Sequence, residues 1–499
     1  MRPTRTSGSR ISVASSGGLE PPSRKSVSAL LHPKVEIALA ALEQMFEMEV
    51  TKCKVEMHKW ETEMKKGLSK STNATAKVKM VPSFVTKLPS GQERGNYLAL
   101  DLGGENLRIV NIKIGEPVRG EPSVEMNSLV YKMTDAVITG PGKKLFGHIA
   151  QCMSDFISKN KGLAKRPLPV GFTMVFPCKQ SSVKEAELTT WRRGYKATDV
   201  IGNDIATMLN TAIAARKDPD MDAQVVAVVS DTVGMMVSGW FSHGRQCRMG
   251  LVIGRGSNAC YMEKVKNVEL IGTDEGEMCI NMEWGAFGDD GILADFRNEY
   301  DKELDALSNN PGEMIFEKMT SSHHMGKLVC IVLCKLIKEH VLLQGRTPPD
   351  WCSNNYVVDS FIFDIENATS VLAVQNFLPD IGIQDANKND CVVIQRVCKA
   401  VSQRSARLCA SGLAAIAVRI CTNERNTSGG TLLAKEQGKI KCGIDESLYN
   451  TPFCEEIKYM VNMLCKDHNI HFEFANAQDG PGKGVALVTA LVNNLKTKK

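Results

Sequence analysis

The chain has 499 residues, of which 43% are hydrophobic and 23% charged, and it carries a formal net charge of +5. Its Lys and Arg residues are scattered, which predicts no nucleic-acid-binding surface, and no apolar run approaches the ~20 residues needed to span a bilayer. The 16 Cys residues include no Cys-x-x-Cys pair. We therefore expect a protein of two or three domains with reduced thiols in the cytoplasm.

The start of the chain is rich in Ser, Arg, Gly and Pro and poor in large apolar residues, which predicts a disordered extension over residues 1–34. Because this segment is also Arg-rich and almost free of acids, mitochondrial association or import stays open. From Val35 to about Lys66, apolar residues recur at a helical period, and Gly67 is expected to end the helix.

Residues 98–110, with the sequence LALDLGGENLRIV, place two glycines between two apolar runs. The pattern predicts a β-hairpin whose turn is Gly103–Gly104. Glycine lets the backbone approach a ligand closely and turn its N–H groups outward, so such a turn can cradle phosphate oxygens. Asp101 could then hold Mg²⁺ through water, and Arg108 could brace the turn. A hairpin without any ligand explains the same pattern.

Farther along, apolar runs alternate with helical patterns. Helices are predicted at residues 145–159, 199–215, 325–343, 390–420 and 484–496, and strands at 168–177 and 224–229. A second hairpin, residues 247–262, repeats the pattern of a strand, a glycine-containing turn and a strand, and residues 442–449 repeat it more weakly. Alternating strands and helices predict an α/β fold with largely buried sheets. Two such turns in two α/β halves suggest a two-lobed nucleotide-binding protein.

Three stretches carry a specific resemblance: Asp231–Gly234 (DTVG), Gly256–Tyr261 (GSNACY) and Cys279–Gly288 (CINMEWGAFG). They closely resemble signatures of the animal-type hexokinase/glucokinase family, and the resemblance covers nearly the whole chain from about Val35. It implies the actin-like ATPase fold, in which two RNase H-like lobes enclose a cleft for a hexose and MgATP, and we expect a monomer. The expected parts are residues 35–81 as a helix and linker on the large lobe, residues 82–230 with the C-terminal helix 485–499 as the small lobe, and residues 231–484 as the large lobe.

The same resemblance implies transfer of the ATP γ-phosphate to the 6-hydroxyl of glucose or a related hexose. Asp231 would be the general base, because a carboxylate at a strand end can accept the hydroxyl proton. Without the motif, a turn-capping Asp would be the default interpretation. Arg193 would act beside the transferred phosphate. The implied sugar contacts are Phe176, Pro177, Ser230, Asn258, Glu283 and Glu317, although Glu317 alone reads equally well as a solvated acid at a helix start. The implied MgATP contacts are Asp101, Gly103, Gly104, Asn106, Arg108, Gly254, Arg255 and Gly256, with Ser411, Gly412 and Asp445 on the adenosine side.

Eight residues depart from those usual in the family, and all fall at the predicted site: Glu105, Val175, Arg192, Arg193, Ser230, Arg255, Met314 and Glu446. Each lost sugar hydrogen bond would weaken binding by ~0.5–1.5 kcal/mol. A carboxylate at Glu105 would repel a triphosphate. Three interpretations stay open: an active hexose 6-phosphotransferase, a catalytically weak or inactive sugar or nucleotide sensor or structural protein, and an active enzyme with an altered substrate. We further predict an ion pair between Glu105 and Arg255 across the cleft; in the alternative, both side chains point to solvent.

Overall fold

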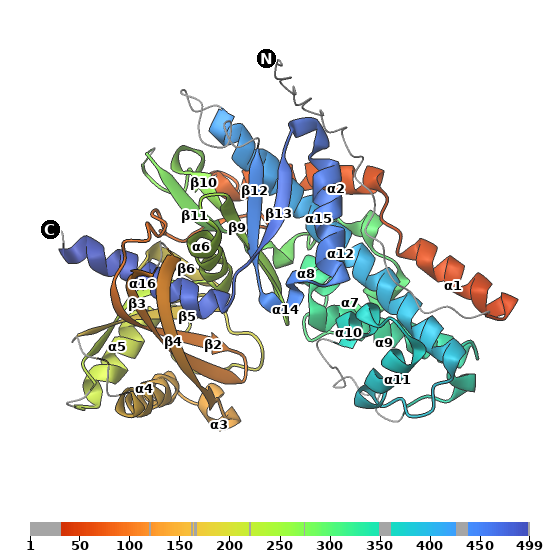
Figure 1. Ribbon diagram of the computed structural model, residues 1–499, viewed down its shortest axis with the longest axis horizontal. Coiled ribbons are helices and arrows are strands. Elements are labelled where there is room, and N and C mark those ends of the chain that lie inside the picture. Colours follow the sequence, from red (N-terminus) through yellow and green to blue (C-terminus); the bar gives the residue numbers. More distant parts are fainter. Residues whose placement is uncertain are drawn as a thin grey trace, which may run out of the picture.

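The computed structural model describes residues 31–118, 121–160, 163, 167–218, 221–273, 275–348, 361–425 and 438–497. Two lobes lie side by side and meet at a central pair of helices (Figure 1). Residues 1–30 of the predicted extension lie outside the described residues. Its predicted end at residue 34 is wrong, because helix α1 (Pro33–Met45) already begins at Pro33, a position where the missing proline N–H needs no helical partner.

The small lobe is built on a five-stranded sheet. Its strands lie in the order β4 (Glu121–Lys132), β3 (Asn106–Val118), β2 (Gly95–Gly103), β5 (Leu168–Met174) and β8 (Ala223–Val229). Strands β2 and β3 form the predicted first hairpin, but Gly103 pairs with Asn106, so the turn is Gly104–Glu105 instead of the predicted Gly103–Gly104. Strand β5 runs parallel to both β2 and β8. The lobe also contains α3 (Asp135–Ile138), α4 (Gly142–Lys159), α5 (Ile205–Ala215) and the small hairpin of β6 (Cys178–Ser182) and β7 (Glu185–Leu188).

The large lobe is built on a six-stranded sheet. Its strands lie in the order β1 (Val81–Pro82), β11 (Glu277–Asn281), β10 (Ser257–Lys264), β9 (Cys247–Ile253), β12 (Lys439–Ile444) and β13 (His471–Asn476). Strands β9 and β10 are the predicted second hairpin, and β12 runs parallel to β9 and β13. Apart from β1, the strand order repeats that of the small lobe. In each sheet, three antiparallel strands form a meander, and two parallel strands lie beside the meander strand that comes first in the sequence. The repeat confirms the predicted two-lobed α/β architecture.

Two helices, α6 (Asp231–His243) and α16 (Gly480–Thr497), lie between the sheets (Figure 1). Helix α6 packs on β9 of the large lobe and α16 packs on β2 and β5 of the small lobe. The helices also pack on each other so closely that a Cβ on Gly484 would overlap the carbonyl group of Gly234. Glycine is needed at this contact because any larger residue would force the helices apart. The C-terminal helix accordingly begins at Gly480, four residues before the predicted Gly484.

The segment predicted as one helix from Val35 to Lys66 forms two. Helix α1 ends at Met45, and α2 (Val50–Leu68) begins after a short connection in which Phe46 and Met48 are buried. The apolar period continues through this connection, so the pattern alone does not mark the break. Both helices pack on α12 (Lys388–Arg425), which runs through the core of the large lobe.

The large lobe contains further helices, several of which pack on α12 at the right of Figure 1. They are α7 (Glu299–Ala306), α8 (Ile315–Thr320), α9 (Ser322–Lys338), α10 (Phe361–Asn367), α11 (Val371–Phe377), α14 (Glu446–Tyr449) and α15 (Pro452–Leu464). Within the described ranges, α12 is the one helix long and apolar enough to cross a membrane, and 78% of its most apolar window is buried inside the protein.

Two further predictions are wrong. A helix does not start at Asp199, where φ is 62°; α5 starts at Ile205 after Asp204, whose carboxylate caps it by accepting the N–H of Thr207. The weak third hairpin at residues 442–449 is absent, because β12 leads directly into helix α14. In both places a helix begins directly after a capping Asp, Asp204 for α5 and Asp445 for α14, and the sequence pattern did not predict either start.

Candidate functional site

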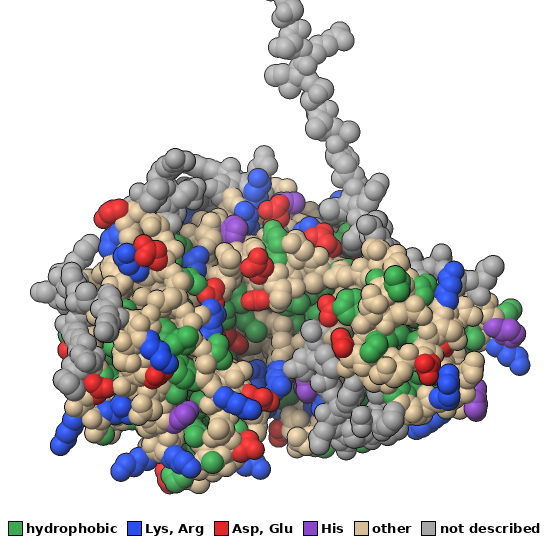
Figure 2. Space-filling view, turned by 60° about the horizontal axis from the view of Figure 1, so that its bottom comes forward, with side chains coloured by type: hydrophobic (Ala, Val, Ile, Leu, Met, Phe, Trp, Pro, Cys, Tyr) green, Lys and Arg blue, Asp and Glu red, His purple; other side chains and the backbone are tan. Residues whose placement is uncertain are grey.

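The cleft between the lobes lies where parallel strands of both sheets reach their carboxyl ends. Residues that follow β5 and β8 of the small lobe and β9 of the large lobe line a cavity of about 1100 Å³. The space-filling view shows the molecule hollowed between the two lobes (Figure 2). Open α/β sheets place ligand sites at this edge, because the loops that follow the strands gather there.

Asp231 stands in the first turn of α6, directly after strand β8. Ser230 caps the helix by accepting the N–H of Val233 at 3.4 Å, and the Asp231 carboxylate accepts the N–H of Thr232 at 2.8 Å. Both Ser230 and Asp231 line the cleft. Burial raises the pKa of Asp231, and the positive charge of Arg193 opposes the rise. A fixed carboxyl group of raised pKa inside a cleft is a candidate general base.

Asn258 and Glu283 belong to one hydrogen-bonded group on the large-lobe side. Asn281 links them, because its Nδ2 donates to Glu283 Oε1 at 2.7 Å and its Oδ1 accepts from Asn258 Nδ2 at 2.8 Å. The Thr232 hydroxyl also donates to Asn281 Oδ1 at 3.1 Å, which joins the group to the helix that carries Asp231. Burial raises the pKa of Glu283 to about 7; the Asn281 hydrogen bond opposes the rise and the Asp231 charge adds to it.

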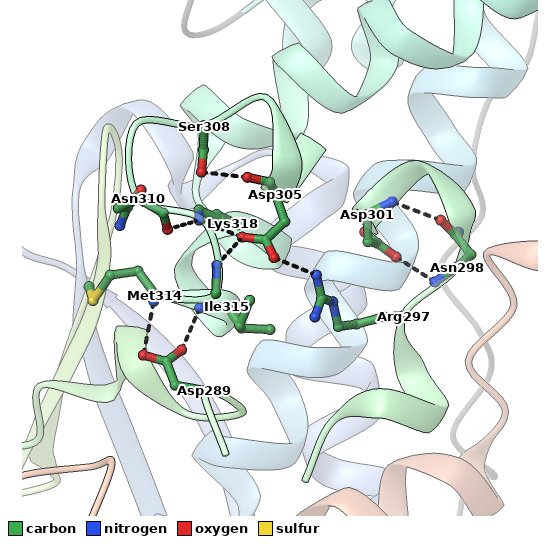
Figure 3. Close-up of polar contacts among 11 residues, drawn as sticks. Asp289, Arg297, Asn298, Asp301, Asp305, Ser308, Asn310, Met314, Ile315 and Lys318 are labelled. Carbon is green, nitrogen blue, oxygen red and sulfur yellow. Dashed lines mark hydrogen bonds and ion pairs between the residues drawn. The ribbon is translucent and has the colours of Figure 1, made fainter. Parts of the chain in front are cut away.

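Glu317 is carried by the short helix α8, which a polar network holds against the lobe (Figure 3). The Asp289 carboxylate accepts N–H groups at the start of the helix at 3.0 and 2.9 Å, and Lys318 donates to Asp305 at 2.7 Å. Glu317 itself accepts the N–H of Ser257 at 3.2 Å and lines the cleft. Burial raises its pKa. The alternative of a solvated helix-start acid does not hold, because this carboxylate faces the cavity.

Residues 190–194, which we call the arginine loop, bring two guanidinium groups into the cleft from the small lobe. Arg193 reaches across to the large lobe: a Cβ added to Gly256 would lie 3.0 Å from Arg193 Nη2. Burial raises the pKa of both Glu317 and Glu283; the charges of Arg193 and Arg192 oppose the rise at Glu317, and that of Arg192 opposes the rise at Glu283. The arginine loop therefore places positive charge opposite the carboxylates of the cleft.

Val175 and Pro177 line the cleft beside the arginine loop. Phe176 does not, although it was predicted to contact the sugar. Its ring is 3% exposed and packs edge-on against the ring of Trp191, with 5.0 Å between the ring centroids. Strand β5 ends at Met174 and the chain bends at Phe176, whose ring also lies 4.9 Å from that of Tyr195 between centroids. Phe176 thus supports the arginine loop from within the small lobe.

Three residues of the cleft hold a left-handed backbone that side chains other than glycine seldom adopt. Arg193, Glu283 and Met314 have φ values of 56°, 55° and 57°. Such conformations persist where the surrounding structure determines them, and they concentrate at functional sites. Their presence on both walls of one cavity supports the assignment of this cleft as the functional site.

The first phosphate turn, residues 103–106, lies at the end of β2, where Gly104 has a φ of 66°. Asp101 and Arg108 are cross-strand partners, so their side chains share one face of the sheet. Arg108 Nη2 donates to Asp479 Oδ2 at 2.8 Å, at the residue where the chain enters α16. Burial raises the pKa of Asp101 to about 6; Asp231 adds to the rise and Arg108 opposes it. Arg108 therefore braces the hairpin through Asp479.

The second phosphate turn, residues 254–256, contains the predicted contacts Gly254, Arg255 and Gly256. Its tip faces the tip of the first turn, with 3.8 Å between Arg255 Nη2 and Glu105 Oε1. The predicted ion pair is therefore present, although 49% of the Arg255 side chain and 69% of the Glu105 side chain stay exposed. The two glycine hairpins therefore face each other across the cleft. This is the arrangement that would let both turns contact phosphates bound between the lobes.

The residues predicted on the adenosine side lie in different places. Asp445 follows β12, and its carboxylate caps α14 by accepting the N–H of Ser447 at 3.0 Å. Ser411 and Gly412 lie inside α12, where Ser411 is fully buried and a Cβ on Gly412 would meet the rings of Trp60 and Trp284. Residues packed in the lobe core cannot contact a nucleotide, so the prediction for Ser411 and Gly412 is wrong.

Two residues of the site were missed from the sequence. Asn281 lies inside the stretch Cys279–Gly288 and is the last residue of β11, so that signature could have identified it. Asp479 lies 371 positions from Arg108, and only the fold brings them together. No local pattern marks such a partner, because the ion pair depends on the crossing of α16 from one lobe to the other.

Comparisons with known proteins agree with this geometry. Two sequence profiles, both described as hexokinase, match residues 38–241 and 248–491. Mouse hexokinase-1 is 42% identical over 442 residues, which are 88% of this chain and 43% of the mouse protein. Human hexokinase-2 is 41% identical over 437 residues, which are 87% of this chain and 46% of the human protein. The chain thus spans about half the length of the curated relatives it matches.

Solved structures extend the likeness to three dimensions. A hexokinase from Schistosoma mansoni, complexed with glucose, has a TM-score of 0.80 and 32% sequence identity, and the match covers 92% of this chain and 99% of that one. Another solved hexokinase, at 22% identity and a TM-score of 0.69, shares the fold. The lobe boundaries at residues 230 and 484 stay predictions. The repeated α/β unit and the matches along both halves leave one conclusion, that this chain belongs to the hexokinase family.

Proposed function

We propose that this chain transfers the γ-phosphate of ATP to the 6-hydroxyl of glucose or a related hexose. One observation carries the proposal: the Asp231 carboxylate lies in the same cleft as Asn258, Glu283 and Glu317, each fixed by hydrogen bonds. A polyol needs several acceptors in fixed positions, and each carboxylate can accept two hydroxyl groups. The glucose in the complex of the Schistosoma mansoni hexokinase supports a hexose as the ligand.

The proposed chemistry uses the residues of the cleft for positioning and for charge. Asp231 accepts the proton of the 6-hydroxyl as its oxygen attacks the γ-phosphorus, and the bond from the γ-phosphorus to the oxygen that bridges to the β-phosphate breaks. Asn258, Glu283 and Glu317 hold the other hydroxyl groups. Arg193 places a fixed positive charge between Asp231 and Gly256, where the transferred phosphoryl group gains negative charge.

Asp101 is the proposed protein ligand of Mg²⁺, through water. Among the described residues, no group of three or more His, Cys, Asp or Glu side chains forms a metal site. This fits an ion that arrives with ATP, because Mg²⁺ keeps several waters and takes phosphate oxygens with one or two carboxylates. When bound, Mg²⁺ neutralises phosphate charge. Asp101 suits this role because it lies in β2, two residues before Gly103 of the first phosphate turn, on the sheet face that also carries Arg108.

A coupled assay tests the proposal. The purified full chain is mixed with glucose and MgATP, and any glucose 6-phosphate is oxidised by a dehydrogenase whose NADPH is followed by absorbance. We expect steady turnover that depends on both substrates. Absence of glucose 6-phosphate, and of hexose-dependent ADP release with glucose and with other hexoses, at protein concentrations high enough to detect one turnover, would overturn the proposal.

The Glu105–Arg255 ion pair favours a second candidate function, that of a catalytically weak or inactive hexose or nucleotide sensor. The pair lies between the two phosphate turns, where incoming phosphates must displace it. A rise of the melting temperature with glucose but no turnover supports this candidate, because a ligand that binds the folded form alone stabilises it. A monomeric state, a cytoplasmic location and the absence of nucleic-acid binding stay proposals, and light scattering after gel filtration tests the first.

A further inference from the structure

The phenol of Tyr195 joins the arginine loop to the first phosphate turn. Its hydroxyl donates to the carbonyl oxygen of Gly104 at 2.7 Å, across 91 positions of sequence. The side chain is 3% exposed, so water does not compete freely for this bond. Neither the polar groups of the sugar pocket nor the ion pairs of the hairpin use this hydroxyl.

The arginine loop folds back so that Tyr195 lies beneath it. Two successive left-handed residues, Arg193 and Gly194 with φ values of 56° and 84°, reverse the chain, and the Tyr195 N–H donates to the Arg192 carbonyl at 3.1 Å. The Tyr195 ring stacks on Trp191 at 5.3 Å between ring centroids. Tyr195 borders the cleft beside the two arginines, but its side chain is buried and its hydroxyl is bonded to the backbone of the first phosphate turn.

The bond to Gly104 determines how the turn presents its backbone. A peptide unit is planar and trans, so the C=O of Gly104 and the N–H of Glu105 point in opposite directions. A hydroxyl that holds this C=O inside the lobe therefore turns the Glu105 N–H outward. The Glu105 carbonyl is held separately, by the N–H of Met133 at 2.8 Å. Backbone N–H groups of such a turn are the groups that can bind phosphate oxygens.

We propose that Tyr195 is a positioning residue, which orients the Glu105 amide toward the nucleotide phosphates and couples the first phosphate turn to the arginine loop. The inference rests on the proposed phosphotransferase function and deepens it. It assigns a role to a single hydroxyl oxygen that touches neither substrate. The role is therefore separable from that of the ring, which packs against Phe176 and Trp191 whether or not the hydroxyl is present.

The test compares Tyr195→Phe with the matched control Tyr97→Phe. Tyr97 is 2% exposed and lies in β2, the strand that leads to the first phosphate turn. It donates its hydroxyl to the Arg94 carbonyl at 2.7 Å, at the end of β2 far from the turn. For Y195F we expect the KM for MgATP to rise roughly three- to tenfold, with the KM for glucose within about twofold of wild type, because one hydrogen bond is lost. For Y97F we expect both KM values to stay at wild-type levels.

Melting temperatures of both variants separate positioning from stability. A positioning role predicts a change in the KM for MgATP in Y195F even where its melting temperature equals that of Y97F. Equal KM values for MgATP in wild type, Y195F and Y97F would overturn the positioning role alone. A wild type that neither turns over nor gains thermal stability with MgATP would overturn the proposed function, and the positioning role with it.

Discussion

The two sides of the cleft are built in different ways. On the sugar side, Asp231, Asn258 and Glu283 extend from strand ends and are joined by hydrogen bonds through Asn281 and Thr232. On the phosphate side, Glu105 and Arg255 occupy the exposed tips of two hairpins and interact at 3.8 Å. The sheets therefore fix the sugar-side groups, whereas a single surface ion pair links the turns. Sugar recognition should thus depend on buried side chains and phosphate recognition on turn backbone and local charge.

The largest effect should come from the sugar side. In Asp231→Asn, turnover is expected to fall by roughly 10²- to 10⁴-fold, the usual contribution of a general base. The amide keeps the shape of the side chain but cannot take the proton. Glucose should still raise the melting temperature of the variant, because Asn258 and the two glutamates still bind the sugar. Turnover of Asp231→Asn within threefold of wild type would show that Asp231 is not the general base.

The second effect is a pH dependence of stability that the buried Glu283 on the sugar side should cause. Burial raises the pKa of Glu283 to about 7 in the folded protein, above its ordinary value of 4.5. Its protonated form is therefore stabilised by folding, and this contribution is complete below the unfolded pKa and lost as pH rises through about 7. Without sugar, wild type should lose up to about 3 kcal/mol relative to Glu283→Gln between pH 4.5 and 8, at about 1.4 kcal/mol per pH unit between the pKa values.

Urea unfolding of wild type and E283Q at several pH values measures this difference. The other acids of the cleft titrate in both proteins, so their contributions cancel to first order. Parallel stability profiles would show that Glu283 is not desolvated in solution, and that the sugar side is as open to water as the turns.

On the phosphate side, Glu105→Gln should strengthen MgATP binding by roughly three- to tenfold. The change removes a negative charge beside the phosphates and frees Arg255 to meet them. Glu116→Gln is the control, because Glu116 lies in the same hairpin, is 84% exposed at its side chain, and pairs with Arg94 away from the turn. Isothermal titration with a non-hydrolysable ATP analogue gives both affinities. Equal affinity in wild type and E105Q would leave Glu105 without an electrostatic effect on the nucleotide.

The smallest effect concerns the stability of the ion pair itself. A double-mutant cycle with E105Q and Arg255→Gln should give a coupling of about 0.2–1 kcal/mol, because exposed pairs contribute little. The coupling should shrink at 1 M salt, where the Debye length is about 3 Å. Additive effects at low salt would mean that the two turns are energetically independent.

The same contrast explains what the sequence could and could not predict. Strands and hairpins follow from apolar runs and glycine positions, which are local patterns, whereas the roles of Asp231 and Glu283 were predicted from the resemblance to the family. Asp479 and Tyr195 could not be found, because their partners, Arg108 and Gly104, lie far away in sequence. The prediction for Ser411 and Gly412 came from the resemblance, although both lie within the helix predicted at residues 390–420. In the structure, packing of Gly412 against Trp60 requires a small residue there.

Helix ends show the same limit. A helical apolar period runs across the connection at Phe46, so one helix is predicted where the chain turns and forms two. The last helix was predicted to start at Gly484, but α16 already includes the glycines after Asp479, which allow it to pack against α6 at Gly234. Contacts between elements, and not local preference, decide these positions.

A crystal structure of the full chain with glucose tests the central claim most directly. The account predicts the sugar between the lobes, with its hydroxyl groups on Asn258, Glu283 and Glu317 and the 6-hydroxyl within hydrogen-bonding distance of Asp231. A glucose bound elsewhere, or one whose 6-hydroxyl points away from Asp231, would contradict it.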